Sequence, residues 1–490
     1  AISKSPYSKI LICQSDLPLQ VRELAKQDNI RIYSYDELIT QVIDFKPYLS
    51  KVITEYKNSE ANKFYTNIQC VSNDGMDLPL DQYVDQWIVH PRYRHLSVLG
   101  SFGSGKTWFC HNLVAVQAER CIQNQNERIP ILITLRDYSK AYDIVQVITD
   151  LFYNRLKIKL PAGYETFDFL NRSGRFLLIF DGLDEMERRV SDYQSVTENF
   201  WELARVTKHE KSKVILTCRN TYFRDEVEEK EVLVKGGKMI NVVGGEKVIE
   251  IGGETPYTTI NLKELSIEEI KEILSKRLGK GMDEIWNAIQ SSPDLFDLAR
   301  RPSLIDMLIR VIPEMKSQRE KFSLNLTKLF ELYIQQSLKR YEENNSSIKV
   351  EERLSFLQEL SWEMFVTQQT SINWAVFPSL VDKYFHLNAS PQSILFYEKS
   401  FRTQSYLSRD EQGNYSFAHK SFMEFFVARK IFKLLLTVEI TSETSISKLD
   451  KEFFNVFGQL PFTVEIRNFI KQFLQEDATK EKDVRKKLND

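Results

Sequence analysis

The chain has 490 residues, of which 42% are hydrophobic and 27% are charged, which is globular composition with room for about three domains. Its 66 Lys and Arg against 68 Asp and Glu leave a formal net charge of -2, so no global basic field supports nucleic-acid or membrane binding. No apolar run reaches the roughly 18 residues of a membrane helix, and the five cysteines lack C-x-x-C spacing. We therefore expect a cytoplasmic protein without a membrane partner.

The first residues alternate between strand and helix patterns. The expected elements are a strand at Ile10–Cys13, a helix from Asp16, a strand at Ile30–Tyr33 and a helix at Asp36–Phe45. This β-α-β-α unit is too small to fold alone, and the chain begins with Ala and enters a strand almost at once. We therefore expect residues 1–50 to be the C-terminal remnant of a larger α/β effector domain upstream, followed by a linker at 51–74.

Residues 75–262 have the strand and helix alternation of a parallel sheet covered on both faces by helices. The expected strands are His95–Leu99, Ile131–Leu135, Phe176–Phe180 and Val214–Thr217. Three glycine pairs at 236–237, 244–245 and 252–253 flank β-prone runs and predict a small hairpin insertion.

Helical periodicity dominates the rest of the chain. A helical domain is expected at 263–345, opened by a capping box of Ser266 and Glu269. Residues 346–432 hold further helices and a hairpin around Asp410–Asn414, an order that suggests a winged helix, and 433–490 would start a second helical region. The expected fold is therefore an α/β nucleotide-binding domain followed by helical and winged-helix domains.

One glycine-rich motif carries the clearest chemistry. It matches G-x-x-x-x-G-K-[ST] and comprises Gly100, Ser101, Phe102, Gly103, Ser104, Gly105, Lys106 and Thr107. It stands directly after an apolar strand and before an amphipathic helix, as a phosphate-binding P-loop requires. Backbone N–H groups would face the phosphates, Lys106 would supply a positive charge, and the Thr107 hydroxyl would bind Mg²⁺.

An acidic segment completes this site. Asp181 ends a five-residue apolar strand, at the edge of the sheet where α/β folds bind ligands, and is the natural Mg²⁺ partner of Thr107. Asp184 and Glu185 follow closely enough to orient an attacking water. Thr207–Glu210 resembles the guanine-reading [NT]-K-x-D segment only poorly, so ATP and ADP are the expected nucleotides.

These motifs together resemble the NACHT branch of the bacterial STAND signalling ATPases over residues 75 to 430. The matching segments are Asp181–Glu185, Thr217–Arg219 as a first sensor, Ile129–Asp137 as the second strand, Arg301–Leu304 as the helical-domain proline motif, and Phe417–Phe426 as the winged-helix His segment. In cyanobacterial members the upstream domain is often a nuclease, and residues 1–46 resemble the end of a restriction-endonuclease-like domain. The catalytic acids and lysine of that nuclease are not visible in this chain.

The resemblance also implies residue roles. Arg219 would sense the γ-phosphate, Pro302 would pack near the adenine or ribose, and His419 would touch the β-phosphate of ADP in a closed resting state. Each residue has a structural alternative: a surface strand-end arginine, a proline at the first position of a helix, and a histidine with a purely structural partner.

The resemblance implies an ATP/ADP-dependent switch that hydrolyses ATP slowly. An unknown trigger, a phage or host molecule, would allow ADP to exchange for ATP, and the opened chain would oligomerise to activate its effector in antiphage defence. Two other functions stay open: a multi-turnover ATPase acting on nucleic acid, and a winged-helix regulator that reads DNA and uses ATP structurally.

Overall fold

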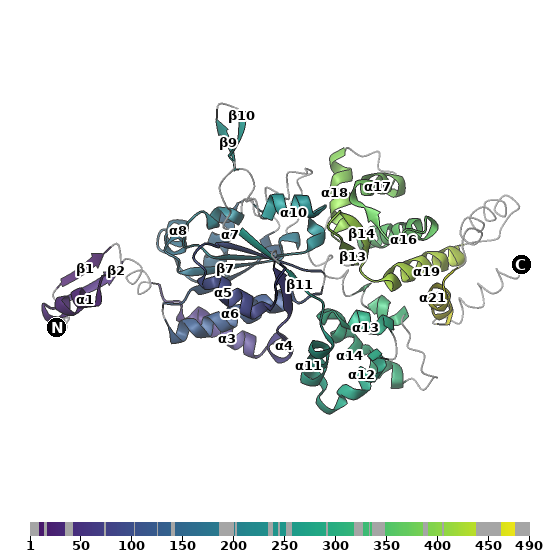
Figure 1. Ribbon diagram of the computed structural model, residues 1–490, viewed down its shortest axis with the longest axis horizontal. Coiled ribbons are helices and arrows are strands. Elements are labelled where there is room, and N and C mark those ends of the chain that lie inside the picture. Colours follow the sequence, from purple (N-terminus) through teal and green to yellow (C-terminus); the bar gives the residue numbers. More distant parts are fainter. Residues whose placement is uncertain are drawn as a thin grey trace, which may run out of the picture.

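The structure is a computed structural model that describes most of the chain (Figure 1). The described residues are 9–13, 17–34, 43–72, 75–101, 103–124, 126–138, 143–185, 200, 203–233, 239–243, 246–250, 257–290, 293–317, 327–332, 334–335, 348–385, 391–403, 406–437 and 462–475. Within these ranges no helix combines the length and the apolar character that a bilayer crossing demands.

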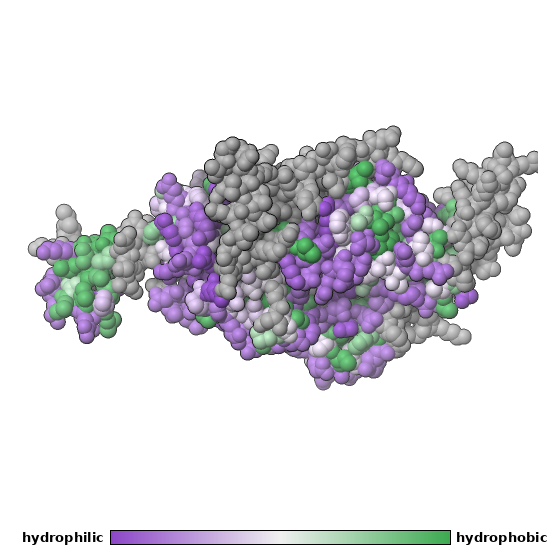
Figure 2. Space-filling model, turned by 45° about the horizontal axis from the view of Figure 1, so that its top comes forward, coloured by the Kyte–Doolittle hydropathy of each residue, from purple (hydrophilic) through white to green (hydrophobic). Residues whose placement is uncertain are grey.

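The N-terminal unit is a small β-α-β element at one end of the molecule (Figure 1). Strands β1 (Lys9–Cys13) and β2 (Ile30–Ser34) pair in parallel, and α1 (Leu19–Gln27) connects them. Several of its apolar side chains face solvent, including Ile10 at 65% and Leu19 at 74% exposure, and Figure 2 shows them at the surface. The expected helix at Asp36–Phe45 lies mostly outside the described residues.

The body of the molecule is a seven-stranded sheet in the order β4-β3-β11-β5-β8-β7-β6. The bounds are β3 Gln69–Ser72, β4 Asp77–Pro79, β5 His95–Leu99, β6 Ile129–Thr134, β7 Phe176–Asp181, β8 Val214–Cys218 and β11 Tyr257–Leu262. Strands β11, β5, β8, β7 and β6 are parallel, while β3 and β4 add an antiparallel edge. The four strands expected from the sequence are all present, within one or two residues of their predicted ends. The expected hairpin insertion is also confirmed, as β9 (Met239–Val243) and β10 (Glu246–Glu250).

Helices cover both faces of this sheet, as Figure 1 shows. Alternate residues of β7 point to opposite faces: Leu177 and Ile179 pack in one core and Phe176, Leu178 and Phe180 in the other. The first core includes side chains of α5 (Leu80–Val89) and α6 (Lys106–Gln123), and the second includes side chains of α7 (Ile144–Asp150) and α8 (Tyr164–Arg172). The two-residue period of a strand therefore explains the continuous apolar run that the sequence shows.

The expected linker at 51–74 is wrong, because its described residues, 51–72, are folded against the central sheet and its helices. They contribute most of α3 (Lys46–Lys57), α4 (Glu60–Phe64) and strand β3 of the central sheet. The Tyr48 hydroxyl donates to the Pro130 carbonyl on β6 at 2.8 Å, and the Tyr56 hydroxyl donates to Asn112 Oδ1 on α6 at 2.8 Å. The domain thus begins before residue 50, inside the segment expected to be the N-terminal remnant, and its anchors are the buried Tyr48 and the half-buried Tyr56.

The helical region after β11 begins with the predicted capping box. Ser266 N donates to Glu269 Oε2 at 2.7 Å, and Glu269 N donates to Ser266 Oγ at 3.2 Å, which satisfies two free backbone donors at the start of the helix. The helices are α11 (Ile267–Leu278), α12 (Met282–Gln290), α13 (Pro293–Ala299) and α14 (Pro302–Ser317).

Residues 350–437 follow in the order helix, short strand, two helices, hairpin and long helix. The elements are α16 (Val350–Val366), β12 (Ile372–Asn373), α17 (Phe377–Phe385), α18 (Pro391–Arg402), β13 (Leu407–Arg409), β14 (Asn414–Phe417) and α19 (Lys420–Thr437). The hairpin predicted around Asp410–Asn414 is confirmed as the antiparallel β13–β14 pair, with Gly413 at a φ of +79° in the turn.

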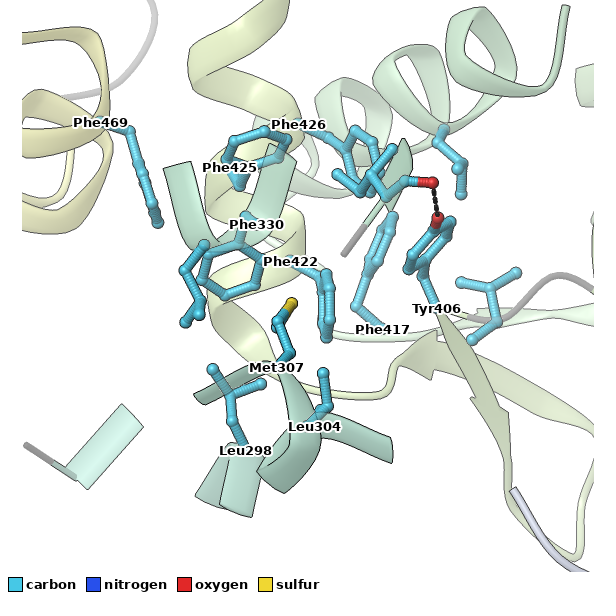
Figure 3. Packing of buried hydrophobic residues seen from close by; sticks show 14 of the residues in the cluster. Leu298, Leu304, Met307, Phe330, Tyr406, Phe417, Phe422, Phe425, Phe426 and Phe469 are labelled. Atoms are coloured by element: carbon cyan, nitrogen blue, oxygen red, sulfur yellow. Dashed lines mark hydrogen bonds between the residues drawn. The ribbon is translucent and has the colours of Figure 1, made fainter. Parts of the chain in front are cut away.

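One aromatic core joins these C-terminal elements (Figure 3). Phe330 packs edge to face on Phe422 of α19, with 4.8 Å between the ring centroids, and stacks on Phe425 with 5.5 Å between the ring centroids. Leu304 and Met307 of α14 belong to the same cluster, and so does Phe469 of α21 (Val464–Gln475). The helical region and residues 350–437 therefore share one core, instead of burying two separate ones.

Candidate nucleotide-binding site

The glycine-rich loop leaves the central strand β5 and turns into α6. Gly103 and Gly105 have φ of +74° and +96°, values that side chains with a Cβ rarely adopt. Helix α6 starts at Lys106 and runs for 18 residues, so its free N–H groups and positive dipole end lie at the loop. Phe102 lies outside the described residues.

Lys106 folds back over the loop. Its Nζ donates to the Gly100 carbonyl at 2.7 Å, to the Ser101 carbonyl at 2.9 Å and to Ser104 Oγ at 3.4 Å. Burial lowers the pKa of this ammonium, and the Asp184 and Asp181 carboxylates act in the opposite direction. An anionic phosphate beside Nζ would also favour the charged form, so the arrangement fits a bound nucleotide phosphate.

Asp181 is a buried carboxylate at the end of β7. Its Oδ1 accepts a hydrogen bond from Thr217 Oγ1 at 2.7 Å and is 3.7 Å from Cys110 Sγ. Because Cys110 follows Thr107 by one helical turn of α6, the first turn of α6 and the end of β7 lie together. Asp181 and Thr107 are the oxygen ligands that could hold Mg²⁺ here.

The acidic turn after Asp181 is tied to Arg219. Gly182, with a φ of +84°, directs the chain into a 3-10 turn at Leu183–Glu185. The Asp184 carboxylate accepts from Arg219 N at 3.0 Å and pairs with Arg219 Nε at 2.8 Å, with both side chains almost fully buried. Glu185, which is half-buried, lies beside Gly182 in the same turn.

Arg219 also contacts the C-terminal part of the molecule. Its Nη1 donates to the Thr403 carbonyl at 2.9 Å, just beyond the end of α18. The expected sensor arginine is therefore a buried residue with partners in two domains, and the alternative of a surface strand-end residue is wrong.

Pro302 and its neighbour Ser303 lie against the P-loop. A Cβ built on Gly105 would be 3.7 Å from Pro302 Cγ, and one built on Gly103 would overlap Ser303 Oγ at 1.9 Å. Ser303 N donates to the Gly103 carbonyl at 3.3 Å. Pro302 is the first residue of α14, as the structural alternative predicts, and it also lies beside the P-loop. Its packing near the adenine or ribose stays a prediction.

His419 precedes α19 and has partners on both ring nitrogens. Its Nε2 is 3.3 Å from Asp297 Oδ2 of α13, and its Nδ1 accepts from Ser421 N at 3.2 Å. The neighbouring Ala418 carbonyl accepts a hydrogen bond from Nη2 of Arg301, the residue before Pro302, at 2.9 Å. The structure thus links His419 to the helical region, while its contact with a phosphate stays a prediction.

Two comparisons with known proteins bear on the domain around this site. Residues 94–242 match the NACHT domain. The uncharacterized WD repeat-containing protein of Nostoc sp. (strain PCC 7120) is 31% identical over 433 residues. That stretch is 83% of this chain and 27% of the Nostoc protein, so the chain spans only about a quarter of its relative. These matches support a NACHT NTPase.

Solved structures resemble the chain more loosely. The Walker-type ATPase of Pyrococcus abyssi has a TM-score of 0.39 at 14% identity and covers 70% of this chain and 93% of its own. The Orc1 protein of Aeropyrum pernix, solved in complex with DNA, has a TM-score of 0.34 at 13% identity and covers 83% of this chain and 94% of its own. Likeness at this level transfers no ligand or activity.

The segment after β8 contacts residues 350–437 through buried side chains. Arg402, fully buried, pairs with Glu398 at 2.8 Å and donates to the carbonyls of Thr221 and Tyr222 at 3.1 and 3.2 Å. The Tyr415 hydroxyl donates to the Phe223 carbonyl at 2.7 Å. The backbone that follows Arg219 is therefore held by side chains of α18 and β14.

Sequence reasoning assigned no role to three residues of the site, Thr217, Ser303 and Thr403, although the first two lie within the segments Thr217–Arg219 and Arg301–Leu304. Thr217 stands in a strand pattern, where a buried Thr is indistinguishable from β-branched core residues. Ser303 falls within the proline motif that the sequence does identify, and its position directly after Pro302 is the feature from which a contact with the P-loop could be predicted. Thr403 acts through its backbone carbonyl, for which no sequence signal exists.

Proposed function

We propose that this chain binds ATP and ADP with Mg²⁺ and uses slow hydrolysis to reset a conformational switch of the NACHT branch of the STAND ATPases. One observation carries the proposal. The P-loop, Asp181 and the Asp184–Arg219 pair lie at the carboxyl ends of β5, β7 and β8, which are neighbours in the order β5-β8-β7. This is the edge at which open α/β sheets bind ligands.

Each residue would have a distinct part in the reaction. The loop N–H groups and Lys106 would hold the β- and γ-phosphates, and Thr107 and Asp181 would hold the metal. Bound Mg²⁺ would neutralise phosphate charge. Glu185 or Asp184 would orient the attacking water, and Glu185 is favoured because both Asp184 oxygens already contact Arg219.

The domain contacts support a switch. Arg219 is joined to the Thr403 carbonyl, and Ser303 of α14 to the P-loop residue Gly103. A nucleotide that draws Arg219 toward its γ-phosphate would therefore compete with the Thr403 contact, and a ligand shifts two states only by such a difference. The helix, strand, helix, helix, hairpin order of 350–417 supports a winged-helix domain that closes on the nucleotide, with His419 as a contact to ADP.

The partners belong to the proposal as well. An opened chain would oligomerise and activate the effector domain upstream, of which the β-α-β unit at residues 9–34 would be the end. In the proposed switch, repeats such as the WD repeats named in the Nostoc relative would receive the phage or host trigger. Antiphage defence is the role that the resemblance suggests.

Light scattering combined with nucleotide exchange tests the switch. The 490-residue chain loaded with ADP should stay monomeric. The His419→Ala variant, which should open the chain, should form larger species when it is loaded with the non-hydrolysable analogue AMP-PNP in Mg²⁺. A chain whose mass is independent of nucleotide, and whose ATP turnover is fast and stimulated by DNA, would instead be an ordinary nucleic-acid ATPase.

A further inference from the structure

We infer that Thr217 is a positioning residue for the magnesium site: its hydroxyl fixes the Asp181 carboxylate and thereby sets the Mg²⁺ affinity of the nucleotide complex. This inference rests on the proposed function, because it concerns the same site. Thr217 is the penultimate residue of β8 and has no solvent exposure. In the segment Thr217–Arg219 the resemblance gives a role to Arg219 and none to Thr217.

The Thr217 hydroxyl joins two strands. It donates to Asp181 Oδ1 at 2.7 Å and accepts from Gly182 N at 2.9 Å. The backbone pairing of β7 with β8 ends at Phe180 and Leu216, so the side chain of Thr217 continues the link between these strands one step further. Both the donor and an acceptor position of the hydroxyl are therefore in use.

This link acts on the acid that would bind the metal. A carboxylate held by a buried donor has already lost the freedom to rotate, so binding an ion requires little further ordering. The Gly182 N–H is held by the same hydroxyl, at the residue whose φ of +84° starts the turn to Asp184 and Glu185. Thr217 therefore positions the metal acid and the first residue of the acidic turn together.

A purely structural role is the alternative. A buried Thr that only ties two strands would contribute to folding, and its loss would weaken nucleotide binding to the same extent with and without metal. A positioning role predicts a selective loss in the presence of Mg²⁺.

The test is Thr217→Val in the 490-residue chain, with AMP-PNP affinity measured by calorimetry across a Mg²⁺ series and in EDTA. We expect the Mg²⁺ concentration for half-maximal binding to rise about tenfold, the lower end of the effect of removing a residue that supports a metal ligand. Affinity in EDTA should stay within about twofold of the wild type. Thr217→Ser, which keeps the hydroxyl, should need the same Mg²⁺ concentration for half-maximal binding as the wild type.

Thr259→Val is the matched control. Thr259 is a buried threonine of β11 in the same sheet, and its hydroxyl has no hydrogen-bond partner within the described residues. Replacing it should leave the Mg²⁺ requirement unchanged. If Thr217→Val does not fold, Thr217→Cys replaces it, because a thiol of similar size is only a weak donor, and it should raise the requirement in the same direction.

Three results would overturn the inference. These are an unchanged Mg²⁺ requirement, an equal loss of affinity in Mg²⁺ and in EDTA, and wild-type binding that is independent of Mg²⁺. The first two leave nucleotide binding with Mg²⁺, and so the proposed function, standing. The third leaves nucleotide binding standing but removes the metal from the proposed site. A wild-type chain that binds no nucleotide at all removes the proposed function and this inference together.

Discussion

Arg219 and Asp184 are bound to each other twice, through the Arg219 backbone N–H at 3.0 Å and through its Nε at 2.8 Å. The two residues come from neighbouring strand ends, and their almost complete burial makes the pair costly to separate. The third contact of Arg219, to the Thr403 carbonyl, places this pair between the nucleotide site and the C-terminal region. Any movement of Arg219 toward a phosphate must therefore alter an interdomain contact.

Lys106→Ala should abolish binding of ATP and ADP. The variant loses the only charged group of the P-loop, and the hydrogen bonds of Nζ to the Gly100 and Ser101 carbonyls go with it. Calorimetry with ATP, ADP and GTP checks this, with the wild type expected to prefer adenine nucleotides. Equal affinity for GTP would contradict the adenine assignment, and unchanged ATP affinity in the variant would contradict the site.

Glu185→Gln should retain ATP and slow its hydrolysis by roughly one to several orders of magnitude, because an amide cannot accept the proton of the attacking water. Asp184→Asn should differ from it, since it also weakens the pair with Arg219. We expect Asp184→Asn to lower thermal stability and Glu185→Gln not to. Single-turnover hydrolysis and melting curves separate the two acids; normal rates in both variants would exclude the acidic turn from catalysis.

His419→Ala should increase the rate of ADP release, if His419 contacts ADP in the closed state. A charge-assisted hydrogen bond of roughly 1.5 to 3 kcal/mol corresponds to an off-rate about ten to a hundred times faster. Asp297→Asn is the matched variant, because it removes the charge of the partner that the structure shows. A lower melting temperature in both variants with an unchanged ADP off-rate would make His419 a structural histidine.

Arg402→Met should destabilise the folded chain by about 3 kcal/mol, because it removes the 2.8 Å partner of the buried Glu398 carboxylate, whose contact with Arg224 Nη2 is longer at 3.9 Å. The double variant Arg402→Met with Glu398→Met should lose much less folding stability than the single variant. The hydrogen bonds of Arg402 to the Thr221 and Tyr222 carbonyls disappear in both variants. Thermal melts of the three proteins measure the difference; equal losses would show that the ion pair is not the source of the effect.

His95 should make the protein sensitive to acid. Burial between Phe200 and Tyr257 lowers the pKa of His95 to about 3, whereas the unfolded chain takes up this proton near pH 6.5. Stability is therefore complete above pH 6.5 and falls below it, by up to about 1.4 kcal/mol per pH unit. Between pH 7 and 5, the free energy of unfolding of His95→Gln should fall less steeply with decreasing pH than that of the wild type.

The sequence by itself determined the local features of this protein. The P-loop, the apolar strands before it and before Asp181, the Ser266 capping box and the hairpin turn at Gly413 all depend on short-range rules. Backbone conformation, capping and two-residue periodicity act within a few neighbours. Such features can be read from the residues that form them.

Only the tertiary structure decided which distant residues meet. Helix α3 (Lys46–Lys57) is part of the nucleotide-binding domain because its Tyr48 and Tyr56 reach Pro130 and Asn112, and no local pattern predicts those partners. The bonds of Thr217 to Asp181, of Arg219 to Thr403 and of His419 to Asp297 likewise join residues 36, 184 and 122 positions apart. Such contacts depend on how whole elements pack, since a side chain finds its partner only after the core has fixed the strands and helices that carry both.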